Sequence, residues 1–156
     1  MAATESRAPR AESTCSIART LEVLGERWTF LILREALSGV TRFADFRHAL
    51  GVAPDVLSDR LATLVTAGVL EKQPYREPGS RVRFSYHVTP AGEELRLVLG
   101  ALQQWGDEHR PLETGPTVVR RAADDERPVS VAFVDDTGAV VPLDRVKFLK
   151  TATYPT

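Results

Sequence analysis

This sequence contains almost no cysteine. It also lacks long apolar runs and a large excess of either charge. Among 156 residues there is a single cysteine, Cys15, which excludes an internal disulfide and a multi-cysteine zinc site. No apolar run approaches the roughly 20 residues that a membrane-spanning helix needs, so no membrane partner is expected. A net charge of -1 excludes the broad positive field of an indiscriminate nucleic-acid binder, so any DNA contact must be local.

Signals for export and for catalysis are also missing. Residues 1–14 hold no apolar stretch of the secretory type, and we interpret them as a disordered arm on a cytoplasmic protein. The three histidines are scattered, no Ser or Cys has an evident base partner, and no glycine-rich phosphate loop is present. The acidic run 124–126 is more typical of a solvated surface than of a metal site. We therefore predict no enzyme activity, no catalytic residue, no cofactor and no metal.

What the sequence does contain is a series of helical patterns that end at glycines. Apolar residues at helical spacing predict two consecutive helices between residues 17 and 39, with an interruption at Gly25. Thr41 can cap a short third helix over residues 42–50, which ends at Gly51.

A further helix follows after a three-residue turn. Pro54 takes the favoured first helical position, Leu57, Leu61 and Leu64 recur on one face, and Gly68 ends the pattern. This helix and the one before it have the proportions of a helix-turn-helix.

Alternating residues after Gly68 predict a two-stranded hairpin with one buried face. Its strands cover residues 69–74 and 81–88, with a polar tip over 76–80. Thr89 then caps a fifth helix that runs to about Asp107. Three helices followed by such a hairpin predict an α+β winged helix-turn-helix.

The C-terminal part has a different composition. Residues 111–128 are polar and indicate a linker or mobile loop, and apolar pairs on both sides of the turn 135–138 predict a second, small hairpin. Val146, Phe148 and Leu149 could add a further short strand. The predicted domains are a disordered arm (1–14), a DNA-binding and dimerisation domain (15–110), a linker (111–128) and a β-rich extension (129–156).

The outer face of the helix that begins at Pro54 carries short polar side chains. Such side chains let a helix lie deep in the major groove, where Ser and Thr can bond several base edges and Asp can accept from cytosine N4. The alternative is a plain solvated helix face. The residues predicted to contact DNA from this helix are Asp55, Ser58, Asp59, Arg60 and Thr63.

Arginines surround this face and favour the DNA-binding interpretation. Arg42 begins the supporting helix, where it could neutralise a phosphate, and Arg76, Arg81 and Arg83 gather at the hairpin tip, where a wing meets backbone or minor groove. The two aspartates of the recognition face would repel phosphates. We therefore expect modest nonspecific affinity and dependence on a few contacts.

In their order along the chain these segments resemble the HxlR-type winged helix-turn-helix regulators of bacteria. The resemblance runs from Cys15 to about His109, through Cys15-Ser-Ile-Ala-Arg, Leu24-Gly-Glu-Arg-Trp28, Arg42-Phe-Ala-Asp-Phe46, Val56-Leu-Ser-Asp-Arg-Leu61, Ala67-Gly-Val-Leu70, Thr89-Pro-Ala-Gly92 and Trp105-Gly106. It implies homodimers built from the first and last helices, a recognition helix over 54–66 and a wing between Tyr75 and Tyr86. It also implies DNA contacts from Ser58 and Arg60, with Arg81 at the wing.

The chain departs from that family at three places. Ala53 is a poor helix cap, Asp55 stands where many relatives carry positive charge, and the tip 77–80 differs from the double-proline wing of the family. The segment 129–149 lies outside the shared core. These departures bear on the operator sequence and on affinity.

Signals that could control DNA binding come from four residues. Cys15 lies at a predicted helix N-terminus, and several redox-sensing members of the family use a cysteine there; the alternative is a reduced, silent cysteine. Trp28, Trp105 and His109 could line a pocket for a small-molecule effector at the dimer seam or simply pack there. The extension could be an effector lid, an added dimer contact or ballast.

The sequence thus predicts a sequence-specific transcriptional regulator that binds double-stranded DNA at a pseudopalindromic operator as a homodimer. We predict a repressor released by a small-molecule or redox signal, with activation as the alternative sign of control. The alternative function is a winged-helix protein-interaction module without DNA binding.

Overall fold

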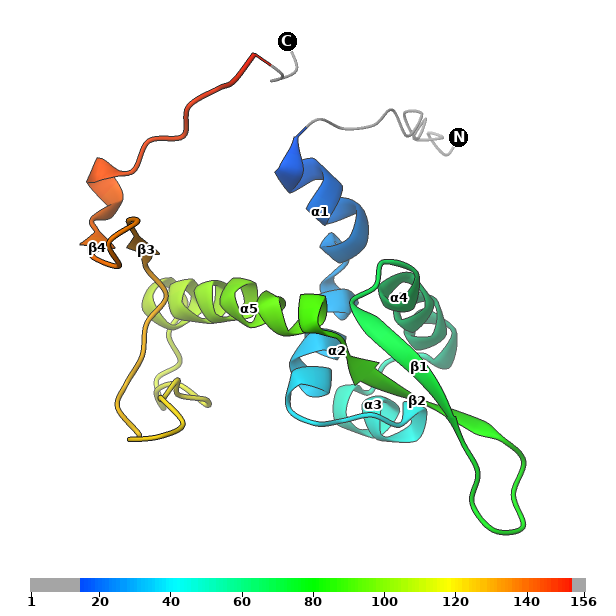
Figure 1. Ribbon diagram of the computed structural model, residues 1–156. Coiled ribbons are helices and arrows are strands. Elements are labelled where there is room, and N and C mark those ends of the chain that lie inside the picture. Colours follow the sequence, from blue (N-terminus) through cyan, green and yellow to red (C-terminus); the bar gives the residue numbers. More distant parts are fainter. Residues whose placement is uncertain (1–14, 153–156) are drawn as a thin grey trace, which may run out of the picture.

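The computed structural model describes residues 15–152, so the predicted arm 1–14 and the last four residues of the extension lie outside the described part. Helices and two separate antiparallel hairpins follow one another along it (Figure 1). The α+β winged helix-turn-helix prediction is confirmed. The elements are α1 (Ser16–Leu24), α2 (Arg27–Leu37), α3 (Phe43–Leu50), α4 (Pro54–Thr66), β1 (Leu70–Tyr75), β2 (Arg83–Val88), α5 (Pro90–His109), β3 (Phe133–Val134), β4 (Val140–Val141) and the 3-10 turn η1 (Leu143–Arg145).

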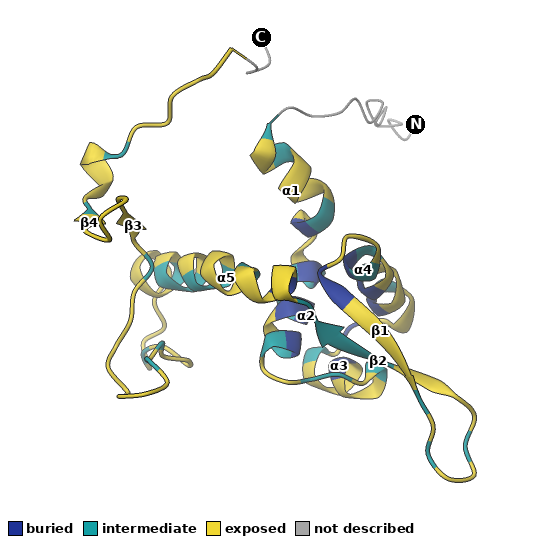
Figure 2. Ribbon diagram, viewed as in Figure 1, coloured by how far each residue is buried: buried dark blue, intermediate teal, exposed yellow. Residues whose placement is uncertain are grey.

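The core lies where α2, α3, α4 and the base of the first hairpin meet (Figure 2). Phe46 of α3 and Ile32 and Leu33 of α2 are fully buried there. The predicted inward face of α4 is confirmed, because Leu57, Leu61 and Leu64 are fully buried too. Burial of each such side chain contributes about 1.5–3 kcal/mol, so this stripe fixes which face of α4 remains outside.

The start of α3 differs from the prediction that Thr41 caps it. Arg42 is the N-cap residue, and no side-chain cap bond is present. The Thr41 carbonyl accepts a hydrogen bond from Tyr86 N at 2.8 Å, and Arg42 forms a bridge with Ser85. Because Thr41 and Arg42 pair with β2 through this hydrogen bond and the isolated bridge, the helix begins one residue later than predicted.

The first hairpin is the wing, and only its base is covered. β1 and β2 pair antiparallel from Leu70↔Val88 to Tyr75↔Arg83. Tyr86 and Val88 are half-buried near the base, and burial raises the pKa of the Tyr86 phenol. Phe84 is 43% exposed, since the outer part of the hairpin extends past the core. The prediction of one buried face is therefore wrong for the outer half of the wing.

Helix α5 leads away from the core (Figure 1). The predicted Thr89 cap is confirmed, since its Oγ1 accepts from Gly92 N at 3.1 Å. Arg96 Nη2 donates to the Leu37 carbonyl at 3.0 Å and so joins α5 to the end of α2. Among the described residues, no helix combines the length and the apolar character needed to cross a membrane.

Part of the segment after α5 is held against the C-terminal half of that helix. The segment predicted as a linker is attached there, because Gln103 Nε2 donates to the Val118 carbonyl at 2.7 Å and Arg120 pairs with Asp107 at 3.4 Å. Gln104 holds the start of the extension with two hydrogen bonds to the backbone of Val131, at 2.9 and 3.0 Å.

The second hairpin is present but small, with two-residue strands β3 and β4 on either side of the turn. The Asp135 carboxylate accepts from the Thr137 hydroxyl, Ala139 N and Thr137 N, and these hydrogen bonds lower its pKa. The predicted further strand at 146–149 does not form. No residue described between 110 and 152 is buried, so this part of the chain has no core of its own.

Candidate nucleic-acid interface

The outer face of α4 is polar and accessible. Because the leucine stripe is held in the core, Asp55, Ser58, Asp59 and Ala62 are exposed on the opposite side. Within residues 15–152 the side chains of Asp55, Ser58 and Asp59 have no hydrogen bond or ion pair. Two carboxylates and a hydroxyl are therefore available on one helix face for groups outside the chain.

Arg60 and Thr63 lie at the edge of this face and are partly engaged. Arg60 Nη1 lies 3.9 Å from Glu26 Oε1 in a long ion pair, in which Arg60 is half-buried and Glu26 is exposed. The Thr63 hydroxyl donates to the Asp59 carbonyl at 2.9 Å, so its oxygen can still accept. Both side chains therefore lie at the edge of the exposed face of α4 and not at its centre.

A cluster of four residues connects the wing to the start of α3. Arg42 Nη1 lies 3.0 Å from Glu77 Oε1, and Arg83 Nη1 lies 3.8 Å from Glu77 Oε2. The Arg42 guanidinium also lies over the Tyr75 ring, 4.9 Å from its centroid. We call Arg42, Tyr75, Glu77 and Arg83 the Glu77 cluster.

The other two predicted wing arginines are held differently. Arg76 Nε donates to the Ser80 carbonyl at 2.9 Å, which closes the tip around Gly79 with its positive φ of 75°. Arg81 is exposed and makes no hydrogen bond or ion pair with any part of the described chain. Of the predicted arginines at the wing, Arg81 thus carries a charge without an internal partner.

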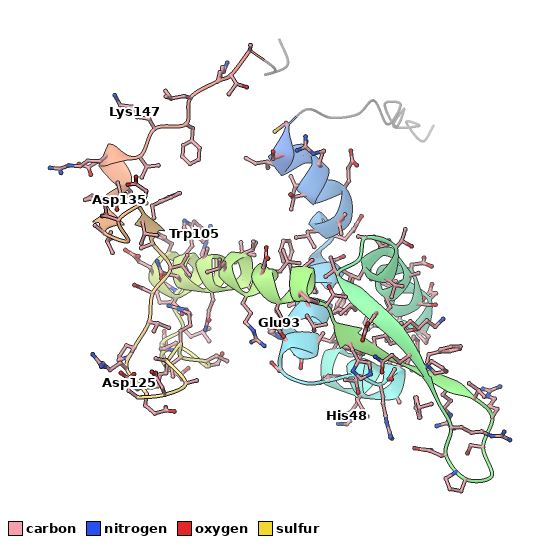
Figure 3. All side chains as sticks on the ribbon, in the orientation of Figure 1. His48, Glu93, Trp105, Asp125, Asp135 and Lys147 are labelled. Carbon is pink, nitrogen blue, oxygen red and sulfur yellow. The ribbon has the colours of Figure 1, made fainter. Side chains whose placement is uncertain are left out.

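The predicted control residues occupy three separate regions. Cys15 is a free, half-buried cysteine that immediately precedes α1. Trp105, which Figure 3 labels, lies in the C-terminal half of α5. Its ring centroid is 5.0 Å from that of His109. Trp28 packs against the core and carries Arg27 over its ring, 5.0 Å from the centroid. Among the described aromatic contacts, Trp28 has none with the other pair.

Sequence reasoning did not assign Glu77 or Tyr75 a role in the site. A carboxylate among the arginines of the tip was a visible signal, but its two partners are 35 and six positions away along the chain. Only the fold brings α3 beside the wing, through the bridge between Arg42 and Ser85.

The order of helices, the exposed second helix of the turn and the following hairpin define the winged helix-turn-helix class of proteins. Within that class the chain belongs to the HxlR-like helix-turn-helix family, whose sequence profile matches residues 23–114. The predicted family is therefore confirmed. By fold and family the chain stands among the HxlR-like helix-turn-helix proteins.

Similar proteins agree with this placement. The "Uncharacterized HTH-type transcriptional regulator Rv3095" of Mycobacterium tuberculosis (strain H37Rv) is 43% identical over 106 residues, which span 68% of this chain and 66% of that relative, just under two thirds. The crystal structure of PA1607, a candidate transcription factor, has a TM-score of 0.77 at 30% identity and covers 90% of this chain and 97% of its own. The PA1374 structure from Pseudomonas aeruginosa has a TM-score of 0.63 at 40% identity, covering 88% and 93%.

These structural matches extend past the family core. A match over 90% of the chain has to include most of the segment after α5, so the likeness to PA1607 takes in the extension. The extension was expected to lie outside the shared part. The family profile itself ends at residue 114, before the extension begins.

Proposed function

We propose that this chain is a cytoplasmic, sequence-specific DNA-binding transcriptional regulator that binds a pseudopalindromic operator as a homodimer. The observation that carries the proposal is the outer face of α4, where Asp55, Ser58 and Asp59 have no partner within the described residues. A helix of this class enters the major groove with such a face toward the base edges.

The roles follow from the chemistry of each group. Ser58 and Thr63 would bond base edges, Arg60 would serve a base or the backbone, and Asp55 and Asp59 would accept from cytosine amino groups. The basic residues around the helix would contact phosphates, where they set register and supply affinity. Those residues are Arg42, Arg76, Arg81 and Arg83.

Two apolar helix faces support a homodimer. Ile17 and Leu21 of α1 are 70% and 52% exposed, and Leu102 and Trp105 of α5 are 51% and 58% exposed. Large side chains so exposed favour burial against a second chain. A pair of chains joined through α1 and α5 would present two copies of α4, as a pseudopalindrome requires.

We further propose that the regulator is a repressor released by a signal. Cys15 is the candidate for a redox signal, and Trp28, Trp105 and His109 are the candidates for a small-molecule effector at the dimer seam. The alternative function is a winged-helix protein-interaction module, which does not require the unpaired positive charge of Arg81 on the wing.

A salt titration of binding to a duplex selected from genomic DNA tests the function. The affinity of the wild-type protein should fall steeply as salt rises, and Arg81→Ala should lower the slope by about one ion, because one phosphate contact is lost. Arg145→Ala, an exposed arginine of η1, is the matched control and should leave the slope unchanged.

Two results would count against the proposal. Absence of salt-dependent duplex binding by the wild-type protein would favour the protein-interaction module. A slope that Arg81→Ala leaves unchanged would remove Arg81 from the DNA contacts.

A further inference from the structure

The Glu77 cluster has the chemistry of an anion site that the chain itself occupies. Two guanidinium groups from separate elements, Arg42 at the start of α3 and Arg83 at the start of β2, each approach a different oxygen of one carboxylate. A phosphodiester offers the same pair of charged acceptor oxygens to guanidinium donors. We propose that Glu77 occupies, in the DNA-free protein, the position that a DNA backbone phosphate takes in the complex, and that it thereby lowers affinity for DNA of any sequence.

The Arg42 guanidinium is restrained by a second contact, which does not involve Glu77. It lies over the Tyr75 ring, 4.9 Å from the centroid, and this restricts its orientation. Arg42 is also the N-cap residue of α3, at the positive end of that helix dipole, although Asp45 supplies a negative charge in the first turn. The contact with Tyr75 keeps the Arg42 guanidinium in place when the carboxylate leaves it.

The carboxylate can be displaced, because the cluster is open to solvent. The side chains of Arg42, Glu77 and Arg83 are 50%, 43% and 54% exposed. Ion pairs so exposed are weak, and a duplex that brings several phosphates at once can replace them. The displaced carboxylate then stays close to the phosphate and repels it.

The functional consequence concerns binding to noncognate DNA. Because the effect acts on the backbone, it reduces affinity for every sequence by the same factor, and base contacts from α4 decide which sites remain occupied. This inference rests on the proposed function, since it requires that the wing and α3 contact DNA.

Glu77→Gln is the test variant, because the amide keeps the shape and an acceptor for Arg42 while it removes the charge. Binding is measured by salt titration on a random-sequence duplex and on the duplex selected from genomic DNA. The variant should bind both more tightly, by the same factor of about threefold to tenfold, and the slope should rise by about one ion.

Glu71→Gln is the matched control. Glu71 is an exposed carboxylate of β1 that accepts from Gln73, so its loss changes the net charge equally without touching an arginine of the cluster. An equal gain in both variants would reduce the effect to net charge and overturn the inference. The gain from Glu77→Gln should also disappear in the presence of Arg42→Ala, because half of the site is then missing.

The remaining outcomes separate this inference from the proposed function. If the wild-type protein binds duplex DNA with the expected salt dependence, but Glu77→Gln binds equally or more weakly, Glu77 only orients the wing and the inference alone is wrong. If the wild-type protein shows no salt-dependent binding to either duplex, both the inference and the proposed function are wrong.

Discussion

The internal contacts of each arginine decide whether its charge is available to bind a DNA phosphate. Four arginines were predicted around the recognition helix on the basis of position alone, and the fold gives them different environments. Arg42 and Arg83 share Glu77, Arg76 bonds a carbonyl of its own turn, and Arg81 has no internal partner among the described residues. A cationic side chain with no internal partner can neutralise a phosphate without first losing a contact.

The core contains one residue with an unmet hydrogen-bonding group. Thr29 is fully buried in α2, and its hydroxyl oxygen has no hydrogen-bond partner in the described structure. Thr29→Val keeps the branched shape and removes the buried polar atom, so we expect the free energy of unfolding to rise by about 1 kcal/mol. Urea denaturation measures the change.

Thr63→Val is the control for that substitution. Thr63 is partly exposed and its hydroxyl already donates to a carbonyl, so the stability should change by less than about 0.5 kcal/mol. A loss of stability in Thr29→Val larger than in Thr63→Val would show that the Thr29 hydroxyl is satisfied in solution.

Residue-scale prediction succeeded where helix periodicity decides the outcome. The spacing of Leu57, Leu61 and Leu64 was sufficient to predict which face of α4 is buried. It failed for Glu77, because the distance between a carboxylate and Arg42 depends on how the wing lies against α3. No local pattern carries that information.

At the scale of elements, the junction between the wing and α5 is closely packed at Gly92. Gly92 is buried, and a Cβ added there would overlap the Val69 carbonyl oxygen and lie 2.8 Å from Val88 Cγ1. Gly92→Ala should therefore push α5 away from the base of the wing and lower the free energy of unfolding by roughly 1–3 kcal/mol. Thermal and urea unfolding test this.

Gly106→Ala provides the matched control in the same helix. A Cβ added at Gly106 meets nothing within 4 Å, and alanine is the better helix former. Its stability should rise by about 0.4–1 kcal/mol or stay the same. If both variants changed stability equally, close packing at Gly92 would not be the cause.

Element boundaries could be predicted wherever a local signal exists. Pro54 is the first residue of α4, and Thr89 is the N-cap of α5, as predicted. Thr41 was misassigned as a cap because its carbonyl pairs with Tyr86, a contact between distant parts of the chain. The apolar residues at 146–149 suggested a strand, yet no neighbouring strand is available there to pair with them.

At the scale of the whole molecule, the extension depends on α5. The amide of Gln104 gives both its donor and its acceptor to Val131, and Gln103 holds Val118. Gln104→Leu should release residues 111–152, so their amides should exchange with solvent faster while those of residues 15–110 stay protected. Hydrogen exchange followed by mass spectrometry reports both regions in one experiment.

The control for this variant is Gln73→Leu, an exposed glutamine of β1 far from the extension. Its exchange over 111–152 should match that of the wild-type protein. Unchanged exchange over the same residues in Gln104→Leu would show that other contacts hold the extension in place.

The composition of 111–128 indicated a linker, since polar residues with glycine and proline are typical of connections. Composition could not reveal the hydrogen bonds to α5, because the glutamines that make them are indistinguishable in sequence from solvated ones. The role of the extension stays a prediction for the same reason.

The absence of any buried residue between 110 and 152 also has a consequence for the order of folding. A segment in which every described residue stays at least partly exposed buries too little apolar surface to offset the entropy lost when it becomes ordered. The contacts of the extension are made by three residues in the last turns of α5, and these residues have the right spacing only when those turns are helical. They are Gln103, Gln104 and Asp107. The extension must therefore become ordered after α5 has folded. Its conformation is set by its contacts with the folded helix.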